Sequence, residues 1–207
     1  MKIISYVVRR DFGFAPNPFF DYCTLATCKP DIRKSAVVGD WVIGTSSKST
    51  GSSNKLVFAM KVTEKLSFDK YWKDARLINK RPVIERSRKI QYGDNIYHQE
   101  NYEWVQIASH HSNEDGSINY LNVATDTKID NVLISDHFYY FGKNGLIIPT
   151  ELSDIIKIGP GHKYIRDNLY EKFLVDFLGK YDLGLYGPPF EWKKLQLEKS
   201  PQLMFSF

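Results

Sequence analysis

Short apolar runs, separated by polar or turn-forming segments, cover much of the chain up to residue 142. Runs of this length, bounded by Gly, Pro, Ser and Asn, are typical of buried β-strands. The polar segment 46–54 is rich in Ser and Gly and predicts a loop that joins its two flanking strands as a hairpin. We therefore expect strands at 3–8, within 23–30, and at 37–47, 55–66, 104–108 and 131–142.

Two segments have helical patterns instead. Residues 67–77 follow a good N-cap residue, Ser67, and place three aromatic side chains on one face. In the segment 162–181 apolar residues recur at every fourth position, which predicts the clearest helix of the chain. Residues 78–103 show no periodicity, and such a long irregular segment in a compact chain is usually functional or mobile.

These elements predict an α+β fold: a small, bent or closed β-barrel with peripheral helices and a long C-terminal helix. Hydrophobic residues make up 43% of the chain and charged residues 25%, which is enough for a substantial core. We find no internal repeat and no linker in the 207 residues. We therefore expect a single domain, with a β-rich core over 1–160 and a helix and tail over 161–207.

The chain is mildly basic, with a net charge of +4, which permits a nucleic-acid partner without requiring one. Basic side chains gather between residues 76 and 89, and two tyrosines follow them. Cations beside aromatic rings are typical of a nucleic-acid surface, and a solvated basic loop fits the pattern equally well. The side chains expected to contact a nucleic-acid backbone are Arg76, Lys80, Arg81, Arg86, Arg88, Lys89 and, ahead of the C-terminal helix, Lys163.

Neither the cysteines nor the apolar runs indicate secretion or a membrane. The only cysteines are Cys23 and Cys28, and no run approaches the roughly 20 apolar residues of a membrane span. We therefore expect a cytoplasmic protein without a membrane partner. Neither cysteine lies in a nucleophile motif, so we expect both in the core. The apolar tail at 201–207 is a candidate for docking on a protein partner.

The sequence SHHSNEDGS at 109–117 is the densest set of chemically capable side chains. Its adjacent histidines have no fixed metal-ligand spacing, so we expect no metal ion. Its Asn-Glu-Asp-Gly part is a strong turn signal. A histidine whose tautomer is set by a carboxylate would suit proton transfer near neutral pH. If the protein is an enzyme, the acid or base would be His98, His110 or His111, and the orienting carboxylate Asp94 or Asp115.

Distinctive phrases are spread over nearly the whole chain. They are GFAPNPF (13–19), CTLATCKPDIR (23–33), GDWVIGT (39–45), LVFAMKVTEKLSFDKYW (56–72), YGDNIYH (92–98), HHSNEDGSIN (110–119), LISDHFYYFG (133–142) and GHK (161–163). Together they resemble the nucleotide modification associated domain 2 family. The resemblance implies involvement with modified DNA or nucleotides beside DNA base-modification and phage-defence systems, and it brings no established reaction.

A Gly-Asp turn with an apolar strand, a polar loop, a second strand and an aromatic helix also resembles the PUA, EVE and ASCH group of modules. In those modules a bent β-barrel holds a base between aromatic rings. The resemblance implies a base pocket here. Contacts inside this pocket must offset the free energy that is lost when a flipped base leaves the stack. The residues placed around that pocket are Trp41, Ser46, Lys48, Asn95, Tyr97, His98, His110, His111 and Asn113.

The predicted function is recognition of a modified base or nucleotide in DNA. Two alternatives stay open: an enzyme that processes a nucleobase or nucleotide by His/Asp acid-base chemistry, and an interaction subunit of a defence complex. The expected partner is DNA or a nucleotide, and the sequence indicates no particular cofactor.

Overall fold

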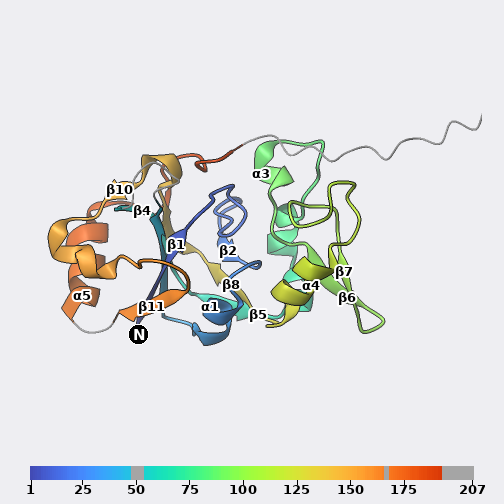
Figure 1. Cartoon of the computed structure of the whole chain (residues 1–207), viewed down its shortest axis with the longest axis horizontal. Coiled ribbons are helices and arrows are strands. Elements are labelled where there is room, and N and C mark those ends of the chain that lie inside the picture. Colours follow the sequence, from blue (N-terminus) through green and yellow to red (C-terminus); the bar gives the residue numbers. More distant parts are fainter. Residues whose placement is uncertain (48–53, 166–167, 193–207) are drawn as a thin grey trace, which may run out of the picture.

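The computed structural model describes residues 1–47, 54–165 and 168–192. Within them, a seven-stranded sheet is the largest element (Figure 1). It consists of β1 (Ile3–Val8), β3 (Trp41–Ser46), β4 (Lys55–Lys61), β9 (His137–Tyr140), β10 (Leu146–Ile147), β11 (His162–Ile165) and β12 (Gly184–Leu185). The order is β11-β1-β3-β4-β9-β12, and β10 pairs with β4. Because β1 and β3 are parallel, their carboxyl ends meet at one edge, where Val8 lies opposite Ser46.

Two smaller sheets lie to one side of the large sheet in Figure 1. The first has the order β2-β8-β5, and the second is the hairpin β6-β7. Their strands are β2 (Cys23–Leu25), β5 (Glu64–Leu66), β6 (Tyr97–Glu100), β7 (Glu103–Gln106) and β8 (Val132–Ser135).

Three apolar clusters hold these layers together. One packs a face of the large sheet, including Tyr6 and Phe58, against the three-stranded sheet at Leu25. The opposite face of the large sheet packs against the C-terminal segment, where Phe173 and Leu178 are completely buried. The third cluster covers the far side of the three-stranded sheet. This layering follows from the alternation of side chains along each strand.

The helices are short and peripheral. The α-helices are α1 (Pro30–Ser35), α2 (Phe68–Lys73), α3 (Arg88–Gln91), α4 (Tyr120–Thr127) and α5 (Asn168–Glu171). The 3-10 helices are η2 (Ala75–Lys80), η3 (Gly142–Asn144), η4 (Thr150–Ile155) and η6 (Leu178–Lys180), and η5 (Lys172–Phe177) is a π-helix. No helix among the described residues is long and apolar enough to cross a membrane.

Several predicted elements are confirmed. The strand at 3–8 is β1, and β3 and β4 pair antiparallel, as expected of a hairpin. In α2 the Ser67 side chain accepts a hydrogen bond from the amide of Lys70, as predicted for its N-cap. The α+β class is also correct.

Two predictions about the fold are wrong. The large sheet runs from β11 to β12 without closing, so the described strands form no barrel. The long helix predicted at 162–181 is absent, because His162–Ile165 pairs with the free edge of β1 and the rest is divided among α5, η5 and η6. The tail at 201–207 lies outside the described residues.

Candidate active site

Cys28 lies in a tight turn between β2 and α1. Cys28 and Lys29 both have left-handed backbone conformations, with φ of 55° and 44°. Such a conformation costs a residue other than glycine about 1 kcal/mol or more, so the surroundings must hold it. The amide of Cys28 donates to Oδ1 of Asp126 at 2.7 Å, and Nε of Arg33 donates to its carbonyl at 2.9 Å. Both the amide and the carbonyl of Cys28 are therefore held by hydrogen bonds.

Asp126 joins this turn to the rest of the site. It lies in the last turn of α4 and is 1% exposed. Its Oδ2 accepts the hydroxyl of Tyr97 at 2.9 Å and faces Nδ1 of His111 at 2.7 Å. Arg33, which is completely buried, donates to the carbonyls of Ile129 at 2.8 Å and Asn131 at 2.7 Å, and so ties α1 to the end of α4. The carboxylate is thus held by several elements at once.

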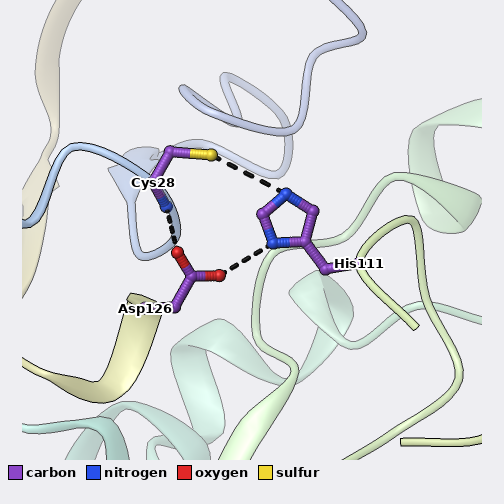
Figure 2. Close-up of side chains that lie close together, drawn as sticks. All are labelled: Cys28, His111 and Asp126. Carbon is purple, nitrogen blue, oxygen red and sulfur yellow. Dashed lines mark hydrogen bonds and ion pairs between the residues drawn. The ribbon is translucent and has the colours of Figure 1, made fainter. Parts of the chain in front are cut away.

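His111 contacts both the carboxylate and the sulfur atom (Figure 2). While Nδ1 faces Asp126, Nε2 lies 3.7 Å from Sγ of Cys28. The carbonyl of His111 accepts from the side-chain amides of Gln106 at 3.0 Å and Asn122 at 2.8 Å, which fixes the backbone that carries the ring. A thiol, an imidazole and a carboxylate in this order are the groups that activate a cysteine nucleophile.

The electrostatics of the site favour a protonated imidazole at His111. Burial lowers its pKa, but the hydrogen bonds to Asp126 and Cys28, and the charges of those groups, raise the pKa to about 9 overall. His111 is therefore an imidazolium at neutral pH. A cation next to a cysteine sulfur is the environment in which the reactive thiolate form occurs.

Cys28 and His111 form part of the wall of a cavity of about 220 Å³, here called the thiol pocket. Its other walls include the rings of Phe12, Phe14 and His110. The ring of His110 lies 4.6 Å from that of Phe12, centroid to centroid, and Phe14 lies 4.7 Å from the ring of His111. Cationic side chains also line the pocket, and they are Arg9, Arg10 and Lys29.

His110 differs from His111 in charge as well as in position. Burial, followed by the charges of His111 and Arg10, lowers the pKa of His110 to about 4. The ring is therefore neutral at pH 7, where it offers an apolar face and one hydrogen-bond acceptor to a ligand. The two adjacent histidines thus have separate roles, and only His111 contacts the thiol.

A metal ion is the competing interpretation of this cluster. One ligand atom from each of Cys28, His111 and Asp126 lies within 4.8 Å of the others. However, both oxygens of Asp126 already accept hydrogen bonds, Oδ1 from the Cys28 amide and Oδ2 from the Tyr97 hydroxyl. To bind both Asp126 and Nδ1 of His111, an ion would also have to displace the 2.7 Å hydrogen bond between them. The arrangement fits a proton-transfer chain better than a metal centre.

Two other predicted site residues belong to a buried polar network. Asp94 accepts hydrogen bonds from Thr24 and Tyr71, each at 2.7 Å. Asn95 donates to the carbonyl of Tyr71 at 3.1 Å. Lys80, predicted to contact a nucleic-acid backbone, is also completely buried and donates three hydrogen bonds within the core. All three side chains form hydrogen bonds within the core, and none of them lines the thiol pocket.

The predicted aromatic walls are dispersed. His98 stacks on Trp72 with ring centroids 4.0 Å apart, and Arg81 lies 3.8 Å over the other ring face. Trp41 packs at the large sheet, beside His137 and Tyr139. None of them lines the thiol pocket, whereas Tyr97 reaches the site through its bond to Asp126.

The turn at 113–117 contains the remaining predicted polar groups. Asn113 donates to Ser117 at 3.0 Å, and Oδ1 of Asp115 accepts the Ser117 amide at 2.9 Å. Both side chains are exposed and satisfy their own loop, in agreement with the turn signal. Neither residue lines the thiol pocket.

The predicted backbone-contact residues do not form one surface around the site. Arg76 pairs with Asp74 and Glu64. Arg88 and Lys89 lie over the rings of Trp192 and Phe19, and Arg86 is exposed. Lys163 lies in β11 and not at a helix start, which corrects that expectation. Ser46 lines a hollow next to the thiol pocket, and Lys48 lies outside the described residues.

Cys28, His111 and Asp126 form a triad, and two of its members were not predicted as site residues from the sequence. Asp126 lies in α4, a helix that was not predicted, and no motif surrounds it. Cys28 was expected in the core, but it is half-buried and lines the thiol pocket. Only the presence of a cysteine, a histidine and an acid in one chain was visible in the sequence, and their proximity was not.

Comparison with known proteins confirms the family resemblance. The model of the nucleotide modification associated domain 2 family matches residues 1–196 of the 207-residue chain. No curated protein and no solved structure matches the chain. The match covers the thiol pocket and all three residues of the triad. The chain therefore belongs to the nucleotide modification associated domain 2 family, which is named for its association with nucleotide modification.

Proposed function

We propose that this protein is an enzyme that uses the Cys28 thiol as a nucleophile on a base or nucleotide, in DNA base modification or phage defence. The observation that carries the proposal is the chain of contacts from Cys28 Sγ through His111 to Asp126 in the wall of a cavity. Membership of the nucleotide modification associated domain 2 family supports a base or nucleotide as the substrate.

The residues have distinct roles in this proposal. Nε2 of His111 already holds a proton next to Cys28 Sγ, so in this proposal the sulfur reacts as the thiolate of an ion pair, and Asp126 stabilises the imidazolium. A sulfur electron pair then forms a bond to an electrophilic carbon of the substrate. The bond from that carbon to the departing atom breaks, the departing atom takes the electron pair, and Nε2 of His111 donates its proton to that atom, which leaves the carbon bonded to sulfur.

The Cys28 amide is not free to act as an oxyanion donor, because it already donates to Asp126. Negative charge that develops on the substrate would instead meet Arg10 and Lys29, which line the same pocket. This feature distinguishes the site from cysteine hydrolases in which the nucleophile's own amide stabilises the oxyanion.

Product analysis tests the proposal most simply. The purified protein is incubated with a panel of nucleotides and of modified and unmodified DNA, and both the products and the intact protein mass are measured. We expect turnover or a covalent adduct with the wild-type protein and with Cys23→Ser, and neither with Cys28→Ser. Cys23 is a suitable control because it is completely buried beside Met60. Equal activity of Cys28→Ser and wild type would refute a nucleophilic role.

A binding module for a modified base in DNA is the second candidate function. The aromatic walls formed by Phe12, Phe14 and His110 favour it, because bases stack on such rings. A binding module would leave every ligand chemically unchanged, and Cys28→Ser would retain its affinity. If one equivalent of a metal ion co-purifies with the wild-type protein but not with Cys28→Ser, the result would instead favour a metal site.

A further inference from the structure

A second hollow adjoins the thiol pocket. Its volume is about 650 Å³, and it shares Val7 and Arg9 with the thiol pocket. We call it the adjacent hollow, and it is further lined by Ser46, Ser47, Asn54, Ile156, Lys157 and Ile158. Both spaces lie where the parallel strands β1 and β3 end, with Val8 opposite Ser46. The carboxyl ends of parallel strands are a favoured place for ligands.

Among the described residues that line the two spaces, all charged side chains are cationic. The cations are Arg9, Arg10 and Lys29 at the thiol pocket and Arg9 and Lys157 at the adjacent hollow. Among the described residues, neither lining includes an aspartate or a glutamate, although the chain contains 24 of these residues and has a net charge of only +4. A continuous groove of positive charge is how proteins track a phosphate backbone.

The thiol pocket and the adjacent hollow differ in size, so they suit different parts of a ligand. Sites that enclose a whole small molecule usually measure roughly 300–1,000 Å³, and the thiol pocket is smaller. Its size suits a base without the attached phosphate. The adjacent hollow is large enough for a further nucleotide and offers apolar surface at Ile156 and Ile158 beside the hydroxyls of Ser46 and Ser47.

We infer that the substrate is a single-stranded polynucleotide, with one base in the thiol pocket, the neighbouring nucleotide in the adjacent hollow, and the linking phosphate at Arg9. This inference rests on the proposed function for the placement of the reacting base. A paired base cannot enter such a pocket without leaving the duplex, which is why a single strand or a flipped nucleotide is required.

Affinity as a function of ligand length tests the inference. Wild type and Lys157→Gln are titrated with a mononucleotide and a tetranucleotide, each as DNA and as RNA. We expect the tetranucleotide to bind at least about tenfold more tightly than the mononucleotide. Lys157→Gln should weaken the tetranucleotide several-fold and lower its salt dependence by about 0.7 in log-log slope, the value for one phosphate of a single strand. Mononucleotide affinity should not change.

Lys172→Gln is the matched control, because Lys172 is exposed and lines neither space. Equal affinity for both lengths, or equal effects of Lys157→Gln and Lys172→Gln, would overturn the inference. Protection of Cys28 from alkylation separates this failure from failure of the proposed function. If mononucleotides protect Cys28 as well as tetranucleotides do, the proposed active site is supported and the single-stranded substrate is refuted. If neither ligand protects it, both fail. A preference between DNA and RNA identifies which strand is the ligand.

Discussion

Replacing Asp126 with asparagine tests the electrostatics of the site through protein stability. The substitution removes the negative charge 2.7 Å from Nδ1 of His111 but keeps an oxygen that can accept the Cys28 amide. Burial lowers the pKa of His111, and the bonds to Asp126 and Cys28 outweigh it, so the pKa rises from its usual 6.5 to about 9. This difference corresponds to about 3 kcal/mol, at roughly 1.4 kcal/mol per pH unit.

The sign of the pH dependence follows from the direction of the shift. Because the pKa of His111 is raised in the folded protein, its contribution to stability is fully present below about pH 6.5 and is lost as the pH rises through about 9. Between about pH 6 and about pH 10, the free energy of unfolding in urea should fall more for the wild type than for Asp126→Asn, by up to about 3 kcal/mol, because Cys28 still raises the pKa of His111 in the variant. Comparing the two proteins cancels the contribution of Lys80, whose pKa is lowered by burial to about 8.

Asp115→Asn is the control for this comparison. Asp115 lies in the same histidine-containing loop but is exposed and accepts its hydrogen bonds from Ser117. Its removal should leave the wild-type pH dependence of stability unchanged. If Asp126→Asn also shows the wild-type pH dependence, His111 is not an imidazolium at neutral pH, and the proposed charge pairing with Cys28 is refuted.

Three further substitutions give distinct expected outcomes. Lys80→Met should lower the free energy of unfolding in urea by about 3 kcal/mol, because it removes three buried hydrogen bonds and the charge partner of Asp94. A loss below about 1 kcal/mol would contradict this account. Arg33→Ala should lower thermal stability and also slow alkylation of Cys28, because Arg33 no longer holds the carbonyls of Cys28, Ile129 and Asn131. Unchanged alkylation would show that Arg33 does not position the thiol. His110→Ala should weaken nucleotide binding about tenfold, measured by titration, and unaltered affinity would exclude its ring as a stacking surface.

The sequence predicted those parts of the fold that depend on neighbouring residues. The strand at 3–8 and the hairpin of β3 and β4 follow from local apolar patterns. The helix predicted at 162–181 failed, because its first residues pair with β1, more than 150 positions earlier in the chain. Helical periodicity in one segment contains no information about a free strand edge elsewhere.

The candidate site shows the same division. The histidine cluster is visible in the sequence, and His111 was among the predicted bases. Its partners were not found, because Cys28 is 83 positions from His111 and 98 from Asp126, and only packing brings them together. Asp94 was predicted as a site residue, yet it is buried in a polar network with Tyr71. Residue type alone does not distinguish a ligand from a satisfied core carboxylate.

The alkylation rate of Cys28 tests the central claim most directly. Wild type, His111→Ala and Cys23→Ser are treated with iodoacetamide between about pH 6 and about pH 8, and intact masses are followed over time. We predict rapid modification of one cysteine in wild type and Cys23→Ser, and a rate at least about tenfold lower in His111→Ala, because the cation next to the sulfur atom is missing. If Cys28 reacts at the same rate with and without His111, it is not an activated nucleophile.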